Sequence, residues 1–346
     1  MAGKPKKETT KKAIVADEPK KVLGIDIGGT KIAICIADTN GEIVASDRVP
    51  SGATAPYEQV LPQIIAVTKK VVDKAGLKLS DIIGCGICAP GPLDMKGGRI
   101  MKSPNLAWDA VPIRDDLVKG LKMPVYMDND ANAGVLAEWF FGSSKGKKDV
   151  IYLTMSTGVG GGIVSGGKLL TGSTGIAGEL GHIILDVNGP MCGCGHFGCL
   201  EAYCGGRSVA LRLQDRLRFR PDHAMFKLPG VDGKLENLSF QAVREGAKIG
   251  IPIAVEMWDE ICFRLAQGIG ILMNTFNPEQ IVLGTAAYYA GDFLLKPVLH
   301  YLPRFAWQEA SRCCEVCISG LGLKIGELAG PSVALNGLYE AGQWRP

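Results

Sequence analysis

Apolar runs and turn-forming residues alternate along the chain, and their spacing predicts a mixed α/β protein. Short apolar runs bounded by glycine, proline or asparagine are typical of strands, whereas longer amphipathic segments are typical of helices. The pattern predicts strands at 22–27, 32–37, 42–49, 82–89, 124–128, 149–155, 163–164, 279–284 and 315–319. It predicts helices at 56–75, 129–141, 207–218, 240–250, 254–276, near 292 and at 327–341, and a loop at 220–238.

Two glycine-rich turns between neighbouring strands divide the chain into similar halves. In the first half, residues 22–27 run into the turn 28–31, and in the second, residues 149–155 run into the turn 156–162. Turns of this kind expose backbone N–H groups that can hold phosphate, and Lys31 adds positive charge. An ordinary hairpin is the alternative for the first turn taken alone. Two such halves suggest a duplicated fold with a binding cleft between them.

The second glycine turn matches neither of two common nucleotide motifs. A Rossmann fingerprint needs a helix after the glycines and the spacing G-x-G-x-x-G, which Ile163 breaks. Residues 162–168 approach a Walker A run, but Leu169 stands where Ser or Thr must bind Mg²⁺. Both motifs are therefore excluded.

Two aspartates follow predicted strands at positions suited to phosphate chemistry. Asp26 ends the first strand and is placed to hold Mg²⁺ through water. Asp130 follows the strand at 124–128, and a carboxylate at the C-terminal end of a strand in an α/β crevice is a common general base. Asp128 or Asp130 could instead cap the following helix, since Asp and Asn are favoured N-cap residues.

One histidine and three cysteines lie close together between residues 178 and 201. They are His182, Cys192, Cys194 and Cys199. Thiolates and imidazole are preferred zinc ligands, and four protein ligands make a closed, structural site. Glycines between the cysteines allow the backbone to turn tightly. Buried cysteines without a metal are the alternative. Glu179 and Glu201 bracket the cluster and are free to face another ligand.

Composition restricts the class of protein. The 346 residues can bury the core of two domains, and eleven cysteines, an odd number, suggest reduced thiols in a cytoplasmic compartment. The sequence has neither an apolar signal-peptide core nor a membrane-spanning run. Residues 1–21 hold seven lysines against three acids, which predicts a disordered basic tail. The remaining chain is nearly neutral, so nucleic-acid binding is not expected.

Together these residues resemble the ROK family, which contains sugar kinases and related repressors with an actin-like (ribonuclease H-like) ATPase fold. The resemblance covers about residues 22–340. Its most specific part is Cys192-x-Cys194-Gly195-x-x-Gly198-Cys199-x-Glu201, downstream of Glu179-x-x-His182. Within the family the chain is similar to bacterial-type glucokinases and to N-acetylmannosamine kinases.

The resemblance also implies roles for individual residues. Asp130 would be the catalytic base. Sugar contacts would come from Gly91, Asn105, Asn129, Asp130, Glu179, His182 and Glu201. Contacts to ATP and Mg²⁺ would come from Asp26, Gly28, Gly29, Thr30, Lys31, Thr157, Gly158, Gly160, Gly161 and Gly284. A structural Zn²⁺ would fix the loop that carries the sugar ligands, with His182 facing both the metal and the substrate.

Two segments depart from the family pattern. Gly284 is followed by Thr285 and Ala286 where a run of glycines is usual, and 321–323 read Leu-Gly-Leu where Leu-Gly-Asn is usual. Both bear on the nucleotide rather than on the sugar. The family's repressors carry an N-terminal winged helix-turn-helix, for which a basic tail of about 21 residues is too short.

We therefore expect an ATP-dependent kinase that converts glucose to glucose 6-phosphate. The alternatives are a kinase of N-acetylmannosamine or N-acetylglucosamine and a non-catalytic sugar-sensing regulator. A homodimer or homotetramer is expected. The expected division is a tail at 1–21, a small α/β domain at 22–129 against which a helix at about 327–346 packs back, and a large α/β domain at 130–326 with a zinc loop at 178–201.

Overall fold

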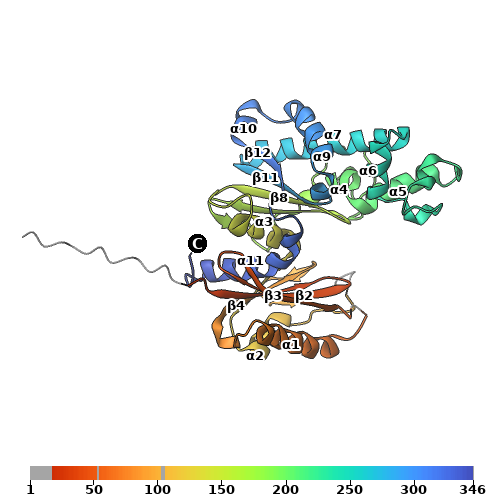
Figure 1. Cartoon of the computed structure of the whole chain (residues 1–346). Helices are drawn as coiled ribbons and strands as arrows, with labels where there is room; N and C mark the ends of the chain where they lie inside the picture. Colours follow the sequence, from red (N-terminus) through yellow and green to blue (C-terminus); the bar gives the residue numbers. More distant parts are fainter. Residues whose placement is uncertain (1–17, 53, 103–105, 346) are drawn as a thin grey trace, which may run out of the picture.

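The computed structural model describes residues 18–52, 54–102 and 106–345 (Figure 1). Its strands are β1 (Lys21–Ile27), β2 (Lys31–Asp38), β3 (Ile43–Pro50), β4 (Ile82–Ala89), β5 (Leu93–Asp94), β6 (Arg99–Ile100), β7 (Val125–Asn129), β8 (Val150–Met155), β9 (Val159–Ser165), β10 (Lys168–Leu169), β11 (Gln280–Thr285) and β12 (Glu315–Ile318). Its α-helices are α1 (Tyr57–Lys74), α2 (Ile113–Leu121), α3 (Asp130–Phe141), α4 (Leu200–Cys204), α5 (Gly206–Leu217), α6 (Phe240–Lys248), α7 (Pro252–Phe276), α8 (Ala286–Ala290), α9 (Asp292–Tyr301), α10 (Gln308–Cys313) and α11 (Ile325–Glu340).

Two five-stranded sheets share one topology. The first has the order β3-β2-β1-β4-β7 and the second the order β10-β9-β8-β11-β12. In each sheet the first two pairings are antiparallel and the last two are parallel. This repeat confirms the duplicated fold that the two glycine turns predict.

Helices α3 and α11 lie between the two sheets and contact each other (Figure 1). Helix α11 packs on β1 and β4 of the first sheet, so the end of the chain returns to the first half. Glycines permit this close approach, because a Cβ on Gly24 would lie 2.0 Å from Pro331 Cδ and one on Gly86 would lie 2.1 Å from the Gly330 carbonyl oxygen. Helices α1 and α2 cover the other face of the first sheet, whereas α4 to α10 belong to the second-half lobe (Figure 1).

The glycines at 160–162 lie inside strand β9, not in the turn where the sequence pattern places them. A Cβ on Gly161 would lie 2.5 Å from Leu180 Cδ1, and one on Gly162 would lie 2.6 Å from the Ala131 carbonyl oxygen. These glycines therefore let α3 and the segment around Leu180 pack onto the strand. The second turn shrinks to residues 156–158, and the strand after it confirms that no Rossmann helix follows.

Most predicted elements are confirmed with shifted ends. The closing helix α11 begins at Ile325, and the helix predicted near residue 292 is the pair α8 and α9, which begins at Ala286. The loop predicted at 220–238 contains two single turns of 3₁₀ helix, Ala224–Lys227 and Leu235–Asn237. The short elements α2, α4, α10, β5, β6 and β10 were not predicted, because such segments depend on tertiary contacts more than on local periodicity.

Two predictions fall wholly or mainly outside the described residues, namely the basic tail, of which 1–17 are not described, and Asn105. The predicted domain boundary after residue 129 coincides with the junction of β7 and α3, and the division into domains remains a prediction. Among the described residues, no helix combines the length and the apolar character needed to cross a bilayer.

Candidate functional site

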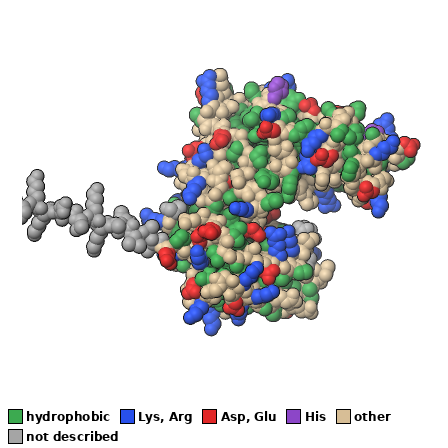
Figure 2. Space-filling view, viewed as in Figure 1, with side chains coloured by type: hydrophobic (Ala, Val, Ile, Leu, Met, Phe, Trp, Pro, Cys, Tyr) green, Lys and Arg blue, Asp and Glu red, His purple; other side chains and the backbone are tan. Residues whose placement is uncertain are grey.

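A hollow separates the two lobes (Figure 2), and residues of both halves line a cavity of about 350 Å³, here named the cleft cavity. Gly91 contributes from the turn after β4, Asn129 and Asp130 from the junction of β7 and α3, and Glu179 from the segment before the metal-ligand cluster. The structure thus brings together four of the residues expected to contact sugar. A cavity of this volume with several polar groups is typical of a small-molecule site.

Asn129, not an aspartate, caps helix α3. Its Oδ1 accepts a hydrogen bond of 2.7 Å from the Asn132 backbone N–H. This arrangement excludes the capping role considered for Asp128 and Asp130. The Asp130 carboxyl is open to solvent within the cleft, yet the surrounding protein desolvates it and raises its pKa, against hydrogen bonds from backbone N–H groups that lower it. An aspartate with a raised pKa is better suited to accept a proton near neutral pH.

A smaller cavity of about 170 Å³, here named the inner cavity, lies where the two hairpins approach each other. Asp26 lines it from β1, while Thr154 and Ser156 line it from β8 and the second turn. Asp130 also borders this cavity, so its carboxyl stands between the cleft cavity and the inner cavity. Burial raises the pKa of Asp26 to about 6, and the nearby Asp130 carboxylate adds to the effect. Two carboxylates that repel each other beside a phosphate-type turn favour a divalent cation.

The first glycine turn is held by its neighbours. The Gly28 N–H donates to the Lys31 carbonyl at 2.9 Å. Ser51, which follows β3 and is buried, donates its hydroxyl to the Gly29 carbonyl at 2.8 Å and its N–H to the Thr30 carbonyl at 3.1 Å. These bonds fix the shape of a turn whose N–H groups could bind phosphate.

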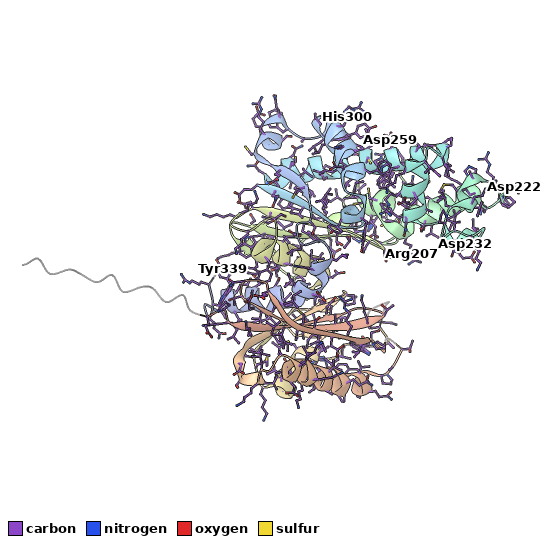
Figure 3. The ribbon with its side chains drawn as sticks, viewed as in Figure 1. Arg207, Asp222, Asp232, Asp259, His300 and Tyr339 are labelled. Atoms are coloured by element: carbon purple, nitrogen blue, oxygen red, sulfur yellow. The ribbon has the colours of Figure 1, made fainter. Side chains whose placement is uncertain are left out.

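The start of helix α5 holds the second turn. The Ser156 carbonyl accepts from the Gly206 N–H, and the Thr157 carbonyl accepts from the Arg207 N–H, both at 2.9 Å. The exposed Arg207 side chain lies on the underside of the second-half lobe, beside the hollow (Figure 3). A guanidinium beside this turn adds a cation to the region where phosphate would lie.

The metal-ligand cluster is preassembled. Its four residues are His182, Cys192, Cys194 and Cys199, whose ligand atoms lie within 4.8 Å of one another. Cys192 Sγ is 3.7 Å from His182 Nδ1, and Cys194 Sγ is 3.7 Å from Cys199 Sγ. Zn–S bonds of about 2.3 Å would place tetrahedral ligand atoms roughly 3.8 Å apart, so the residues fit zinc. His182 Nε2 lies 3.9 Å from Glu179 Oε2, on the side of the cleft cavity.

Glu201 connects this cluster to the second turn. Its Oε2 accepts a 2.9 Å hydrogen bond from the Val159 N–H, and its Oε1 lies 3.5 Å from Cys192 Sγ. A Cβ on Gly158 would lie 2.3 Å from Glu201 Oε2, so the turn needs glycine at this point. The carboxylate therefore holds the turn that follows β8 beside the metal cluster, a role that the sequence motif does not reveal.

A family model described as the ROK family matches residues 22–328. The chain belongs to the ROK family. A glucokinase of Halalkalibacterium halodurans is 34% identical over 309 residues, which cover 89% of this chain and 93% of the relative. The crystal structure of the ROK hexokinase from Thermus thermophilus matches with a TM-score of 0.79 and 30% identity, covering 92% of this chain and 99% of that one. The ROK glucokinase from Streptomyces griseus, solved with glucose and AMPPNP, matches with a TM-score of 0.74 and 32% identity, covering 91% and 99%.

These matches confirm the predicted actin-like fold. In this ROK protein, three residues expected to contact the nucleotide lie inside strands. Gly160 and Gly161 border the cleft cavity from strand β9 rather than lying in the second turn. Gly284 lies in β11, where a Cβ would be 1.9 Å from the Tyr152 hydroxyl, so close packing requires a glycine. Thr285 follows at a φ of 54°, a left-handed conformation that favours the glycine usual in the family.

Sequence reasoning missed three further residues of the ROK site. Ser51 follows an edge strand and carries no motif, and Arg207 is marked only as the start of a helix. Met95 lines the cleft cavity from the turn between β5 and β6, two strands too short to be predicted from the sequence. Only the proximity of Arg207 to the glycine turn in the fold identifies it, and no local signal would have done so.

Proposed function

We propose that this ROK-family protein is an ATP-dependent sugar kinase that transfers the γ-phosphoryl group of ATP to the 6-hydroxyl of glucose. The observation that carries the proposal is the position of Asp130, which borders both the cleft cavity and the inner cavity. A base at the point where a sugar site meets a phosphate site is what phosphoryl transfer to a hydroxyl requires. Relatives named as glucokinases, and a structure with glucose and AMPPNP, support both ligands.

In this proposal, different residues accept the proton, bind the sugar, position the phosphate and hold Mg²⁺. Asp130 accepts the proton of the sugar hydroxyl as that oxygen attacks phosphorus, and its raised pKa suits this transfer. Glu179 accepts hydrogen bonds from ring hydroxyls, while the Asn129 amide nitrogen can donate because only its oxygen is occupied by the cap. The two turns position phosphate oxygens through backbone N–H groups. Asp26 would hold Mg²⁺, which supplies neutralisation of charge on the transferring phosphate.

The metal-ligand cluster would act on substrate affinity indirectly. His182 and the three cysteines would hold Zn²⁺, which supplies rigidity to the loop between the two glutamates. Glu179 then faces the cleft cavity, and Glu201 holds the second turn. Whether Glu201 also contacts sugar, as the family resemblance implies, remains a proposal.

The test is ADP release in a coupled assay with Mg²⁺-ATP and glucose, mannose, fructose, N-acetylglucosamine and N-acetylmannosamine. The expected result is a dominant glucose signal, which Asp130→Asn reduces by at least roughly a hundredfold while glucose binding persists. A dominant acetylated sugar would retain the mechanism and replace the substrate. Silence with every sugar, or full turnover by Asp130→Asn, would refute the proposal or the assigned base.

A further inference from the structure

A third cavity, of about 510 Å³ and here named the rear cavity, lies next to the cleft cavity. Strand β7, the loop at 171–175 and the last turns of α11 line it. Met95 and Gly175 border both cavities, and a Cβ on Gly175 would lie 2.8 Å from Met95 Cγ. One contact between the first and second halves therefore separates the two cavities.

The wall of the rear cavity contains a buried carboxylate with an unused oxygen. Asp128 is only 5% exposed, and its Oδ1 accepts from the Asn129 N–H at 2.8 Å and from Asn132 Nδ2 at 2.7 Å. Within the described part of the chain, no residue donates to Asp128 Oδ2. Asp128 lines the cavity and this oxygen is not enclosed by protein, so a ligand that brings a hydroxyl can donate to it.

Helix α11 adds a second acceptor to the same wall. Asn336 is 7% exposed, and its Nδ2 donates to Glu340 Oε1 at 3.2 Å. Its Oδ1 is buried and has no donor among the residues that the structure describes. Asp128, Asn336 and Glu340 thus offer several acceptors and few donors, which matches a molecule with several hydroxyl groups.

The rim carries the opposite charge. Lys96 is exposed at the edge of the cavity, and Arg114 lies beside it with its Nη1 on the Met95 carbonyl at 3.2 Å. These cations disfavour an ammonium ligand and attract an anionic group. A molecule that fits both features has hydroxyls directed to the inner wall and a phosphate at the rim.

We propose that the rear cavity binds a phosphorylated polyol, with its phosphate at Lys96 and its hydroxyls at Asp128 and Asn336. The choice of ligand rests on the proposed function, because the product of that reaction, glucose 6-phosphate, is a phosphate ester with several hydroxyl groups. A ligand held by β7, α11 and the loop at 171–175 fixes the spacing of the two halves beside Asp130. Its occupancy therefore inhibits sugar turnover without competing with sugar.

The experiment is calorimetric titration of the full-length protein with glucose 6-phosphate in saturating glucose, which fills the cleft cavity. Sorbitol 6-phosphate and inorganic phosphate are titrated in parallel. Lys96→Glu removes the rim cation, and Ser173→Trp narrows the cavity from an exposed loop position, so neither change depends on the core. Lys296→Glu, on exposed α9 of the other lobe, is the matched charge reversal.

The expected result is that glucose 6-phosphate binds the wild-type protein. Lys96→Glu weakens this binding by roughly tenfold or more, Ser173→Trp abolishes it, and Lys296→Glu leaves it unchanged. Tighter binding of sorbitol 6-phosphate would support the site and show that its ligand is a phosphorylated polyol other than the reaction product. Loss of binding in saturating glucose, or equal binding by inorganic phosphate, would overturn the proposal. Binding with this pattern in a protein that phosphorylates no hexose would refute the proposed function alone.

Discussion

The chain passes from the second sheet back to the first through the segment between β12 and α11, here named the joint. The buried carboxylate of Glu138 holds this segment. Glu138 is 0% exposed on helix α3. Its Oε2 accepts from the Ser143 N–H and hydroxyl, both at 2.9 Å. Its Oε1 accepts from the Ser319 hydroxyl and from the Leu321 N–H, the latter at 3.2 Å. Replacing this side chain should therefore loosen the segment between β12 and α11.

The magnitude follows from the groups left behind. In Glu138→Ala, the hydroxyls of Ser143 and Ser319 can rotate to other acceptors, but the N–H groups of Ser143 and Leu321 lose theirs. Both N–H groups belong to half-buried residues, and each that loses its acceptor costs about 1–3 kcal/mol, so we expect a loss of about 4 kcal/mol in the free energy of unfolding. Glu138→Gln keeps one acceptor oxygen but turns an NH₂ group toward the hydrogen-bond donors on the other side. We therefore expect this variant to lose about 2 kcal/mol in the free energy of unfolding.

Urea unfolding followed by tryptophan fluorescence and far-ultraviolet circular dichroism measures both losses. Glu256→Ala is the control, because Glu256 is 67% exposed and its ion pair with Arg216 should contribute less than about 1 kcal/mol. A looser joint should also raise the KM for sugar, since both halves line the cleft cavity. Wild-type stability in Glu138→Ala, or a Gln variant less stable than the Ala variant, would refute the reasoning.

Three further predictions concern the site. Glu201→Ala should cost about 1–3 kcal/mol of stability and raise the KM for ATP, because the Val159 N–H loses its acceptor, whereas Glu201→Gln should retain most of both; equal effects would contradict this account. Metal analysis should find about one zinc per chain, and Cys194→Ser should lower that content and make the loop at 178–201 more susceptible to protease; a metal-free, protease-resistant loop would exclude structural zinc. Because desolvation by the surrounding cleft raises the pKa of Asp130, which would act ionised, kcat/KM should fall as pH drops through a value above the usual aspartate range, and a flat profile at such pH would contradict its role as the base.

The sequence predicts those parts of the site that depend on local chemistry. The ligand types and spacing of the four candidate metal ligands indicate their cluster, and the structure brings their ligand atoms within 4.8 Å of one another. Glycine turns after apolar runs likewise predict both hairpins, because backbone conformation at a turn is largely local. The place of Asp130 after a strand likewise predicts its position at the cleft cavity.

Long-range packing accounts for what the sequence could not supply. Gly160 to Gly162 look like a longer turn, but their lack of side chains serves the packing of α3 and Leu180 against β9. Glu201 looks like a ligand residue, and only the fold shows its hydrogen bond to Val159. The same holds for Ser51, whose partners lie about twenty residues earlier in the chain, on the neighbouring turn.

The duplicated halves use equivalent positions in different ways. Strands β7 and β12 occupy the same place in their sheets, each parallel to its neighbour. After β7 the chain enters α3, where Asn129 serves as the cap and leaves Asp130 free in the cleft. After β12 the chain instead donates from Ser319 and Leu321 to Glu138. One copy of the strand end thus leads to the Asp130 carboxylate at the two cavities, while the other is held to α3 before the chain turns into α11, the helix that packs on the first sheet.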